Sequence, residues 1–382
     1  MKVLMICFNK INQGTYLRAF EFARGLIEFG HEVTLMATSE KWGSGFQEYE
    51  EKGIKILTTP DLSRGSLRSG WDPYNVIARL RWLKGRNYDI VHAFESRPTV
   101  IYPALNRQKK GVPMVMDWCD WLGYGGSVEQ RPNPIVRAIL RPVESYYENN
   151  FRTLADANIV ICSTLFERAL GLGVNRSNLA IIPNGFNLPD WKKYSMDVVR
   201  QAMGIPKDDF VVGCVGSLFP GDAQLMSKAF ENIKKQLPKS RLFHIGRSNY
   251  TSSSNDSVYN FGPVDPERLC QLVSACDVCW LPFEDTNANR GRFPLKFTNY
   301  LAAGKPCVVT DVGDIADYVR NEGVGLTCPP TPADLAGSVL RLYVDLTLRE
   351  QFAMEAEKLS QDSRYTWMAR ATELLSIYKR VI

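Results

Sequence analysis

The chain has 382 residues, of which 45% are hydrophobic and 23% charged, the composition of an ordinary globular protein long enough for two domains. Its net charge of +5 is too small to indicate a nucleic-acid-binding protein. No apolar run reaches the ~18 residues that a membrane span requires. The first residues have neither the long apolar core nor the cleavage site of a signal peptide. Nine cysteines, an odd number, then indicate reduced thiols and a cytoplasmic location.

Short apolar runs alternate with helical segments through the first half of the chain. The runs at 2–8, 31–38, 54–59, 88–94, 112–118 and 157–162 predict strands, and helices are predicted at 16–29, 76–84, 102–110 and from 164 onward. Apolar strands separated by helices are typical of a parallel sheet that is covered on both faces.

The pattern restarts after a Pro-, Gly- and Asn-rich linker at 181–191. Strands are predicted at 210–219, 241–246, 258–264, 277–283 and 306–311, with helices at 223–236, 266–276 and 294–304. We therefore expect an α/β protein with two doubly wound Rossmann-like domains, at 1–186 and 187–364, whose strands present their carboxyl ends to a shared crevice. Neither G-x-G-x-x-G nor a P-loop is present, which argues against hydride transfer and P-loop nucleotide hydrolysis.

The segment from Asn289 to Asp311 is the most informative stretch. Arg290, Arg292 and Lys296 lie at the start of a predicted helix, whose N-terminal N–H groups attract anions. Together they predict a site for a diphosphate. The alternative is a packed helix–strand unit with solvated basic residues.

A second basic stretch, 61–110, has ten Lys and Arg against four acidic residues, with Trp71, Tyr74 and Trp82 interleaved. Such a mixture fits peripheral contact with the inner face of an anionic membrane. It also fits a solvated helix face. The cysteine pair Cys276 and Cys279 lies in an apolar run with no second pair or histidine beside it, so we expect no metal site there.

Six stretches, in this order and spacing, resemble glycosyltransferase family 4: 1–37, 88–94, 157–185, 211–218, 275–283 and 293–314. The resemblance implies the GT-B fold, two Rossmann-like domains facing across a cleft, with a final helix, here 365–382, that returns to the first domain. It implies transfer of a hexose, with retention, from a UDP- or GDP-linked sugar in the second domain to a glycan, glycolipid or other lipid-linked acceptor at the first. It implies no bound cofactor.

Five positions depart from the family pattern. Ser217 and Asp222 stand where the family often has an Arg and a Lys on the donor diphosphate, and Gly291 and Asn299 stand where it often has two Glu. An acceptor-side histidine is replaced by Phe94. We hypothesise that Arg247, Arg290, Arg292 and Lys296 supply the missing positive charge. Two alternatives stay open: a sugar-nucleotide epimerase, which has the same fold, and a non-catalytic binding or partner subunit, which the missing glutamates suggest.

The expected donor-binding residues combine the family's positions with this relocated charge. They are Gly216, Ser217, Arg247, Gly262, Arg290, Arg292, Phe293, Lys296, Asn299 and Tyr300. Asn299 and Tyr300, on the face of Lys296, are the candidates for the ribose, although an aromatic residue at this spacing is commonly a core residue. Arg290 and Lys296 are expected to stabilise the leaving diphosphate.

The expected acceptor-binding residues lie in the first domain: Gly14, Arg18, His92, Glu95, Arg97, Asp117 and Asp120. Glu95 is also a candidate catalytic residue. His92 has an alternative as a buried, hydrogen-bonded core residue, and Asp117 and Asp120 have one as capping residues beside buried Trp side chains. The absence of a D-x-D pair argues against a divalent metal.

Overall fold

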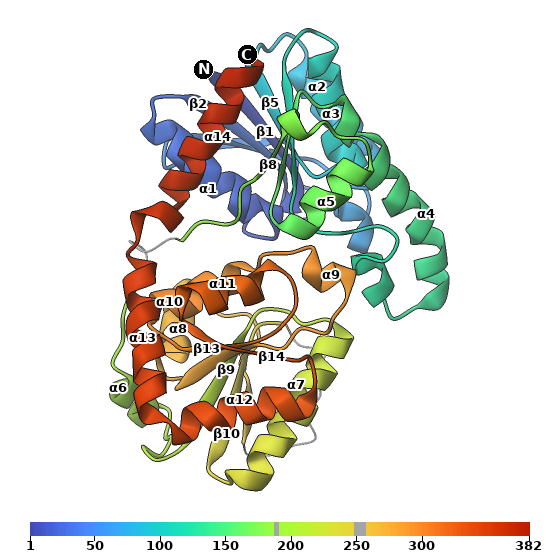
Figure 1. Ribbon diagram of the computed structural model, residues 1–382. Helices are drawn as coiled ribbons and strands as arrows, with labels where there is room; N and C mark the ends of the chain where they lie inside the picture. Colours follow the sequence, from blue (N-terminus) through green and yellow to red (C-terminus); the bar gives the residue numbers. More distant parts are fainter. Residues whose placement is uncertain (187–190, 248–256) are drawn as a thin grey trace. The chain divides into compact units, whose positions relative to one another are not determined.

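A computed structural model describes residues 1–186, 191–247 and 257–382, which form two compact units (Figure 1). Unit 1 comprises Met1–Gly185, Gly291–Phe293 and Trp367–Ile382, and unit 2 comprises Phe186–Arg290 and Pro294–Thr366. The segment Gly291–Phe293, which the sequence pattern predicts in the second domain, is thus part of unit 1. Each unit is described separately below.

Unit 1 has an eight-stranded sheet in the order β3-β4-β2-β1-β5-β6-β7-β8. Its strands are β1 (Lys2–Lys10), β2 (Glu32–Thr38), β3 (Gln47–Glu51), β4 (Ile54–Thr59), β5 (Ile90–Phe94), β6 (Met114–Trp118), β7 (Ala157–Val160) and β8 (Leu179–Ile181). Its α-helices are α1 (Thr15–Glu28), α2 (Pro73–Leu83), α3 (Pro98–Gln108), α4 (Pro134–Asn150), α5 (Ser163–Gly171) and α14 (Trp367–Val381). Short 3₁₀ turns are η1 (Gly65–Arg68), η2 (Ser127–Gln130), η3 (Arg152–Leu154) and η4 (Arg176–Asn178).

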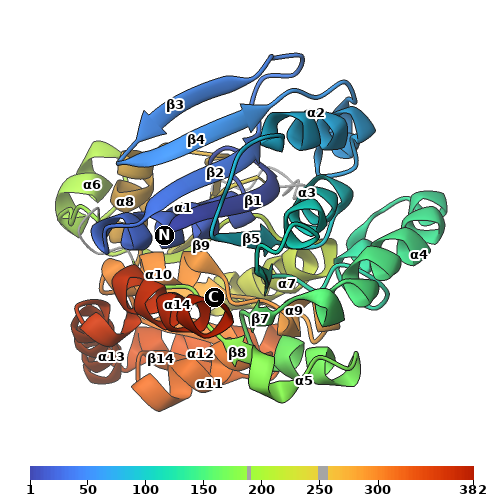
Figure 2. The same ribbon diagram turned by 90° about the horizontal axis from the view of Figure 1, so that it is seen from above.

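Seven strands of this sheet are parallel to their neighbours, and only the edge strand β3 is antiparallel (Figure 2). Every residue of β3 is exposed, and the strand carries three glutamates. Exposed charge on an edge strand discourages pairing with another chain. The same charge explains why no hydrophobic pattern predicted this strand.

Different helices pack against the two faces of the sheet. Leu4, Ile6 and Phe8 of β1 pack in one buried cluster with side chains of α2 and α3. His92 of β5 faces the other way, where Phe22 of α1 and Tyr378 of α14 lie against it. The predicted parallel sheet with helices on both faces is therefore confirmed for unit 1.

Helices α1 and α14 approach each other closely at a glycine. A Cβ atom on Gly25 would lie 2.3 Å from the Cβ of Ala371, well inside van der Waals contact. We expect Gly25→Ala to lower the free energy of unfolding by about 1–3 kcal/mol through overpacking, despite the better helix propensity of alanine. Adding Ala371→Gly should restore most of the loss. Thermal unfolding of both variants measures this, and a stabilised Gly25→Ala protein would contradict the contact.

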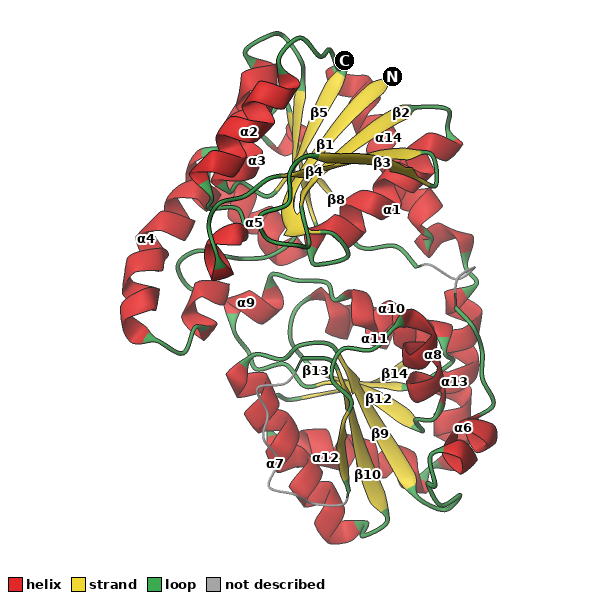
Figure 3. Cartoon of the chain, turned by 180° about the vertical axis from the view of Figure 1, so that it is seen from behind, coloured by secondary structure: helices red, strands yellow, loops and turns green. Residues whose placement is uncertain are grey.

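Unit 2 has a six-stranded, all-parallel sheet in the order β11-β10-β9-β12-β13-β14 (Figure 3). Its strands are β9 (Phe210–Val215), β10 (Ser240–Ile245), β11 (Val258–Asn260), β12 (Val278–Leu281), β13 (Cys307–Thr310) and β14 (Gly325–Cys328). Its helices are α6 (Met196–Ala202), α7 (Pro220–Gln236), α8 (Pro266–Ser274), α9 (Asn287–Arg290), α10 (Leu295–Ala302), α11 (Asp314–Glu322), α12 (Pro332–Val344) and α13 (Leu346–Ser360), with the turn η5 (Ser363–Tyr365).

Both sheets contain a topological switch point. There the chain stops adding strands on one side of the first strand and adds the next strand on its other side. In unit 1 this point lies between β1 and β5, and in unit 2 it lies between β9 and β12. Connections diverge there at the carboxyl ends of the strands and leave room for a ligand. The fold thus indicates one candidate binding edge in each unit.

Candidate functional site

Lys296 lies at the switch point of unit 2. Gly216 directly follows β9, and Phe283 follows β12. The Lys296 Nζ is 5.1 Å from the centre of the Phe283 ring. A Cβ on Gly216 would lie 3.4 Å from Cδ and 3.9 Å from Nζ of Lys296. A positive charge thus stands where the connections of β9 and β12 diverge.

Glycine is required at the end of β9. Gly216 has φ +91°, a conformation that side chains disfavour. Gly246, after β10, has φ +149°, and a Cβ there would lie 2.8 Å from the carbonyl of Gly216. The Nε2 of His244 is 3.1 Å from the Gly216 carbonyl oxygen. The two loops are therefore held close together, with little side-chain bulk at the edge of the sheet.

Lys296 also belongs to the first turn of α10. Pro294 precedes this helix without a side-chain hydrogen bond to its amides. The positive end of a helix dipole and a neighbouring cation favour a bound anion. Asn299, one turn further along, is half-buried. The predicted helix and the placement of Lys296 and Asn299 on it are thus compatible with a diphosphate and an adjoining ribose.

Tyr300 lies in the core instead. Its side chain is fully buried, and its hydroxyl accepts a hydrogen bond from the Val215 amide at 2.8 Å and donates to the Trp280 carbonyl at 3.3 Å. The hydroxyl therefore joins β9 to β12. This is the core alternative that the sequence left open, and Tyr300 is removed from the ribose candidates.

The other predicted cations are distributed differently from Lys296. Arg290 forms an ion pair with Asp285, and about half of its side chain is exposed. Arg292 belongs to unit 1, where its charge acts on Asp120. Arg247 is exposed beyond β10. The expected cluster of Arg290, Arg292 and Lys296 is thus divided between the units, with Arg292 in unit 1 and Arg290 and Lys296 in unit 2.

Three further candidates for donor binding lie outside helices and strands. Ser217 is exposed in the loop after β9. Gly262 has φ +65° in the loop after β11. Phe293 is buried in unit 1, where its carbonyl accepts a hydrogen bond from the Asn184 side chain at 2.8 Å.

Asp222, at the position where the family often has a lysine, is occupied by structural contacts. It is fully buried in α7 and accepts hydrogen bonds from the Glu284 amide at 2.9 Å and from the Asn289 side chain at 2.7 Å. Its carboxylate therefore fixes the 284–289 loop. The charge that appeared to oppose a diphosphate has hydrogen-bond partners within the protein.

In unit 1, Glu95 ends β5 in a strained conformation with φ +69°. Its carboxylate accepts hydrogen bonds from the Cys119 amide at 2.6 Å and the Asp120 amide at 3.3 Å, and lies 3.2 Å from Arg152. Burial raises the pKa of Glu95 to about 8, and Arg152 opposes this rise. Glu95 thus joins the carboxyl ends of β5 and β6, next to the unit 1 switch point.

Arg18 and Asp117 form a fully buried ion pair. The Arg18 Nε donates to Asp117 at 2.9 Å, and its other nitrogens donate to the Ile182 carbonyl at 2.7 Å and the Asn184 side chain at 3.2 Å. The pair therefore anchors α1 and β6 to the segment after β8 that contains Ile182 and Asn184. Both residues were predicted to contact the acceptor, and the contacts that the structure gives them are internal.

His92 is a core residue, which was the other alternative left open. It is fully buried, its Nδ1 is 2.7 Å from the Tyr378 hydroxyl, and its ring stacks on Phe94. Burial lowers the pKa of His92 to about 4. The packing of β5 against α14 explains this site without a ligand.

The lowered pKa of His92 predicts that the protein loses stability in acid. Because the folded pKa lies below the ordinary 6.5, His92 contributes stability that is present above pH 6.5 and lost as the pH falls toward 4. We expect the residue to account for a loss of about 3 kcal/mol in the free energy of unfolding over that range. The double variant His92→Phe/Tyr378→Phe should lose less over the same range in urea unfolding. An unchanged pH dependence would contradict this assignment.

The remaining acceptor candidates line the same edge of unit 1. Gly14, with φ +53°, precedes α1, and the Asn9 side chain occupies the space of its missing Cβ. Arg97 pairs with Glu144 at 2.9 Å and donates to the Ser69 carbonyl. Burial raises the pKa of Asp120 to about 6, against the charge of Arg292. Glu144 and the other residues that pair with these candidates were not predicted, because no sequence motif marks them.

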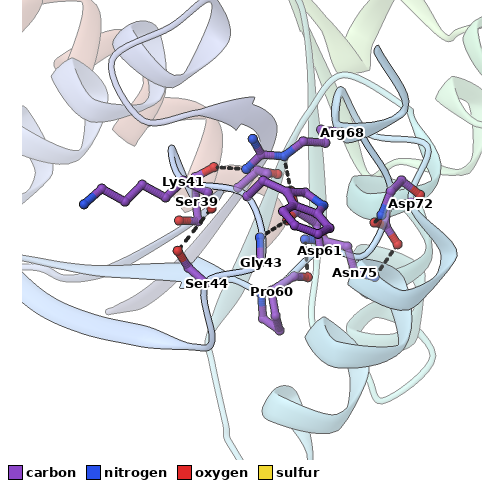
Figure 4. A network of polar contacts seen from close by, with 12 residues as sticks. Ser39, Lys41, Gly43, Ser44, Pro60, Asp61, Arg68, Asp72 and Asn75 are labelled. Carbon is purple, nitrogen blue, oxygen red and sulfur yellow. Dashed lines mark hydrogen bonds and ion pairs between the residues drawn. The ribbon is translucent and has the colours of Figure 1, made fainter. Parts of the chain in front are cut away.

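A further polar network lies after β2 and β4 (Figure 4). Arg68 forms an ion pair with Asp61 and donates to the Ser39 carbonyl at 2.7 Å. Asp72 caps α2 and accepts hydrogen bonds from the Leu62 and Ser63 amides. Four of the ten cations of the 61–110 stretch are buried in such contacts: Arg68, Arg79, Arg97 and Arg107. Six are exposed: Arg64, Arg81, Lys84, Arg86, Lys109 and Lys110.

All nine cysteines are buried, and none is in a disulfide. In residues 1–186, 191–247 and 257–382, no group of three or more His, Cys, Asp or Glu side chains is placed to hold a metal ion. Among the helices of the described residues, none combines the length and hydrophobicity that crossing a bilayer requires.

Two family models match the chain, one in each half. Residues 14–189 match Glycosyltransferase Family 4, and residues 209–345 match Glycosyl transferases group 1. An uncharacterised glycosyltransferase of Methanocaldococcus jannaschii is 22% identical over 99% of this chain and 98% of its own length.

Solved structures share the fold over the whole chain. Sucrose-phosphate synthase of Thermosynechococcus elongatus has a TM-score of 0.76 at 18% identity, covering 100% of this chain and 99% of its own. Anabaena HepE, crystallised with UDP and glucose, has a TM-score of 0.72 at 16% identity, covering 99% of each chain. These similarities extend over both units.

Proposed function

Because the chain belongs to glycosyltransferase family 4 and has the GT-B fold, we propose that it transfers a hexose from a UDP- or GDP-linked sugar, with retention of the anomeric configuration. The acceptor is a glycan or a lipid-linked sugar. Unit 2 binds the donor and unit 1 binds most of the acceptor. The crystallisation of the similar HepE with UDP and glucose supports a nucleotide-sugar donor.

The observation that carries this proposal is the position of Lys296 at the switch point of unit 2. A diphosphate that leaves water for a partly enclosed site must meet positive charge, and charge-assisted hydrogen bonds are strong there. Lys296 supplies such a charge beside Gly216 and at the start of α10. Arg290, Arg292 and Arg247 are proposed as secondary contributors. Asn299 is proposed to bind the ribose hydroxyls as donor and acceptor.

The reaction requires one bond to form and one to break at the anomeric carbon. The acceptor oxygen bonds to this carbon while its bond to the diphosphate oxygen breaks, and the acceptor proton passes to the departing diphosphate. In this proposal Lys296 and the α10 amides stabilise the negative charge that develops on the leaving group. The side chains of unit 1 orient the acceptor, which lowers the entropic part of the barrier.

Proton NMR of the full chain with candidate donors and an acceptor panel tests the function. A new glycosidic bond with the anomeric configuration of the donor supports retaining transfer, and an inverted one contradicts retention. Conversion of the donor without any acceptor would identify an epimerase. Tight donor binding without turnover on every acceptor would favour the non-catalytic alternative.

A further inference from the structure

A short segment of unit 1 leads directly into the helix that carries Lys296. This segment, Gly291–Phe293, is called the strap below. Arg290 before it and Pro294 after it both belong to unit 2. Helix α10 begins one residue after Pro294. Whatever holds Phe293 in unit 1 therefore also restrains the backbone at the start of α10.

Asn184 holds the strap from within unit 1. This residue is 6% exposed. Its Nδ2 donates a hydrogen bond to the Phe293 carbonyl at 2.8 Å, and its Oδ1 accepts one from Arg18 at 3.2 Å. Arg18 is itself fixed by its buried ion pair with Asp117. A buried amide that uses both its donor and its acceptor is held in one orientation. The strap is thus connected to a buried ion pair of unit 1.

The same residue precedes another point at which the chain changes unit. The chain leaves unit 1 after Gly185, and the first residue of unit 2, Phe186, donates its amide to the Tyr365 carbonyl at 2.7 Å. Tyr365 is one residue from the point at which the chain returns to unit 1. These passages are therefore hydrogen-bonded in pairs, and the bond from Asn184 to Phe293 is the one that holds the strap.

The first turn of α10 depends on the backbone before it. Pro294 occupies the N-cap position and has no side-chain group that could accept a hydrogen bond from the first-turn amides, as Ser, Thr, Asn or Asp would. Further along, Phe297 is fully buried, and the Tyr300 hydroxyl accepts a hydrogen bond from the Val215 amide. The body of the helix is thus fixed in unit 2. Its first turn, with Lys296, has the strap in place of a cap.

We infer that Asn184 is a positioning residue for the donor site: by holding the strap, it keeps Lys296 and the first turn of α10 in the orientation that binds the diphosphate. This inference rests on the function proposed above for Lys296. Asn184 acts through the strap and does not itself contact the donor. A small displacement of a binding group can cost a large factor in affinity or rate, so one hydrogen bond far from Lys296 in sequence can control the site.

Two substitutions at Asn184 test this role. Asn184→Ala loses both hydrogen bonds, whereas Asn184→Asp keeps the size of the side chain and the acceptor for Arg18 but has no N–H group for the Phe293 carbonyl. Both variants should bind UDP or GDP, whichever the wild type binds, about 3- to 10-fold more weakly. Isothermal titration calorimetry measures this at a temperature at which circular dichroism shows every variant folded. A purely structural role would lower the free energy of unfolding and leave the nucleotide affinity unchanged.

Hydrogen exchange supplies a second measurement that requires no ligand. The Phe297 amide donates to the Pro294 carbonyl at 3.1 Å, so exchange in a peptide that spans residues 294–299 reports opening of the first turn. Exchange there should be about tenfold faster in both Asn184 variants than in the wild type, because the strap no longer restrains the turn.

Asn75 provides a matched control. It is a buried amide of unit 1, 1% exposed, which donates to the Pro60 carbonyl at 2.9 Å in the network after β4. Asn75→Ala should also lower the free energy of unfolding, but it should leave the exchange of residues 294–299 and the nucleotide affinity as in the wild type.

Three results would overturn the inference. Unchanged exchange at 294–299 in both Asn184 variants would show that the strap does not restrain α10. Equal nucleotide affinity of Asn184→Asp and the wild type would show that the restraint does not affect the donor site, and the proposed function would stand. The same effects in Asn75→Ala would show general destabilisation. A wild type that binds neither UDP nor GDP would instead contradict the proposed function and, with it, the role of Asn184.

Discussion

The variant Lys296→Ala is expected to bind UDP or GDP about 10- to 100-fold more weakly than the wild type. Removing the ammonium deletes a charge-assisted contact worth roughly 1.5–3 kcal/mol. Because the same charge is proposed to stabilise the departing diphosphate, kcat/KM should fall further, by about 10²- to 10³-fold. Isothermal titration calorimetry measures the first effect and initial rates the second.

A matched control makes the same lysine-to-alanine change at a lysine outside the proposed site. Lys207 is 81% exposed in unit 2, where it pairs with Asp197. Lys207→Ala should leave both affinity and kcat/KM within about twofold of wild type. If Lys296→Ala behaved in the same way, the switch point of unit 2 would not bind the diphosphate.

The largest expected effect on stability comes from Arg18→Leu. The substitution leaves the fully buried Asp117 carboxylate without its guanidinium, which costs about 3–5 kcal/mol of unfolding free energy. Arg18→Leu/Asp117→Leu removes both charges and should recover part of that loss. Urea unfolding, monitored by circular dichroism, measures both variants.

The comparison for Arg18 is an ion pair of similar geometry on the surface. Arg320 lies 3.0 Å from Asp311 and 2.7 Å from Asp317, with 44% of its side chain exposed. Arg320→Leu should cost less than about 1 kcal/mol. A loss from Arg18→Leu as small as that would mean that the buried pair does not hold unit 1 together.

Most of the strands could be predicted from the sequence because they depend on local patterns, whereas β3, β8 and β14 were not predicted. Uninterrupted apolar runs such as Val3–Cys7 are buried in the structure, as expected for a parallel sheet. Lys296 could be recognised because a proline, a lysine and a helix pattern lie within a few residues of one another. The order of the motifs indicated the family, which a family 4 model over residues 14–189 and a group 1 model over residues 209–345 match, and the fold, which solved glycosyltransferase structures share.

The contacts of the candidate residues could not be predicted, because they join positions far apart in the chain. Arg18 and Asp117 are 99 residues apart, and His92 and Tyr378 are 286 apart. A polar residue at a strand end has the same sequence pattern whether it faces a ligand or a buried partner. Tyr300 and His92 therefore had two open interpretations until their hydrogen bonds were known.

Helix α4 was missed for a related reason. Its apolar residues have helical spacing, but two prolines and several polar residues interrupt the segment, and Pro142 lies inside the helix. Its orientation depends on Arg97 and Arg168, which are distant in sequence. The sequence therefore gave no sign of the apolar face that α4 exposes.

The most direct test of the proposed donor site is a crystal structure of the full chain with UDP or GDP, whichever nucleotide binds. We expect a diphosphate oxygen at hydrogen-bonding distance from the Lys296 Nζ, next to Gly216 and the first turn of α10. A diphosphate bound elsewhere, with no contact to Lys296, would contradict it.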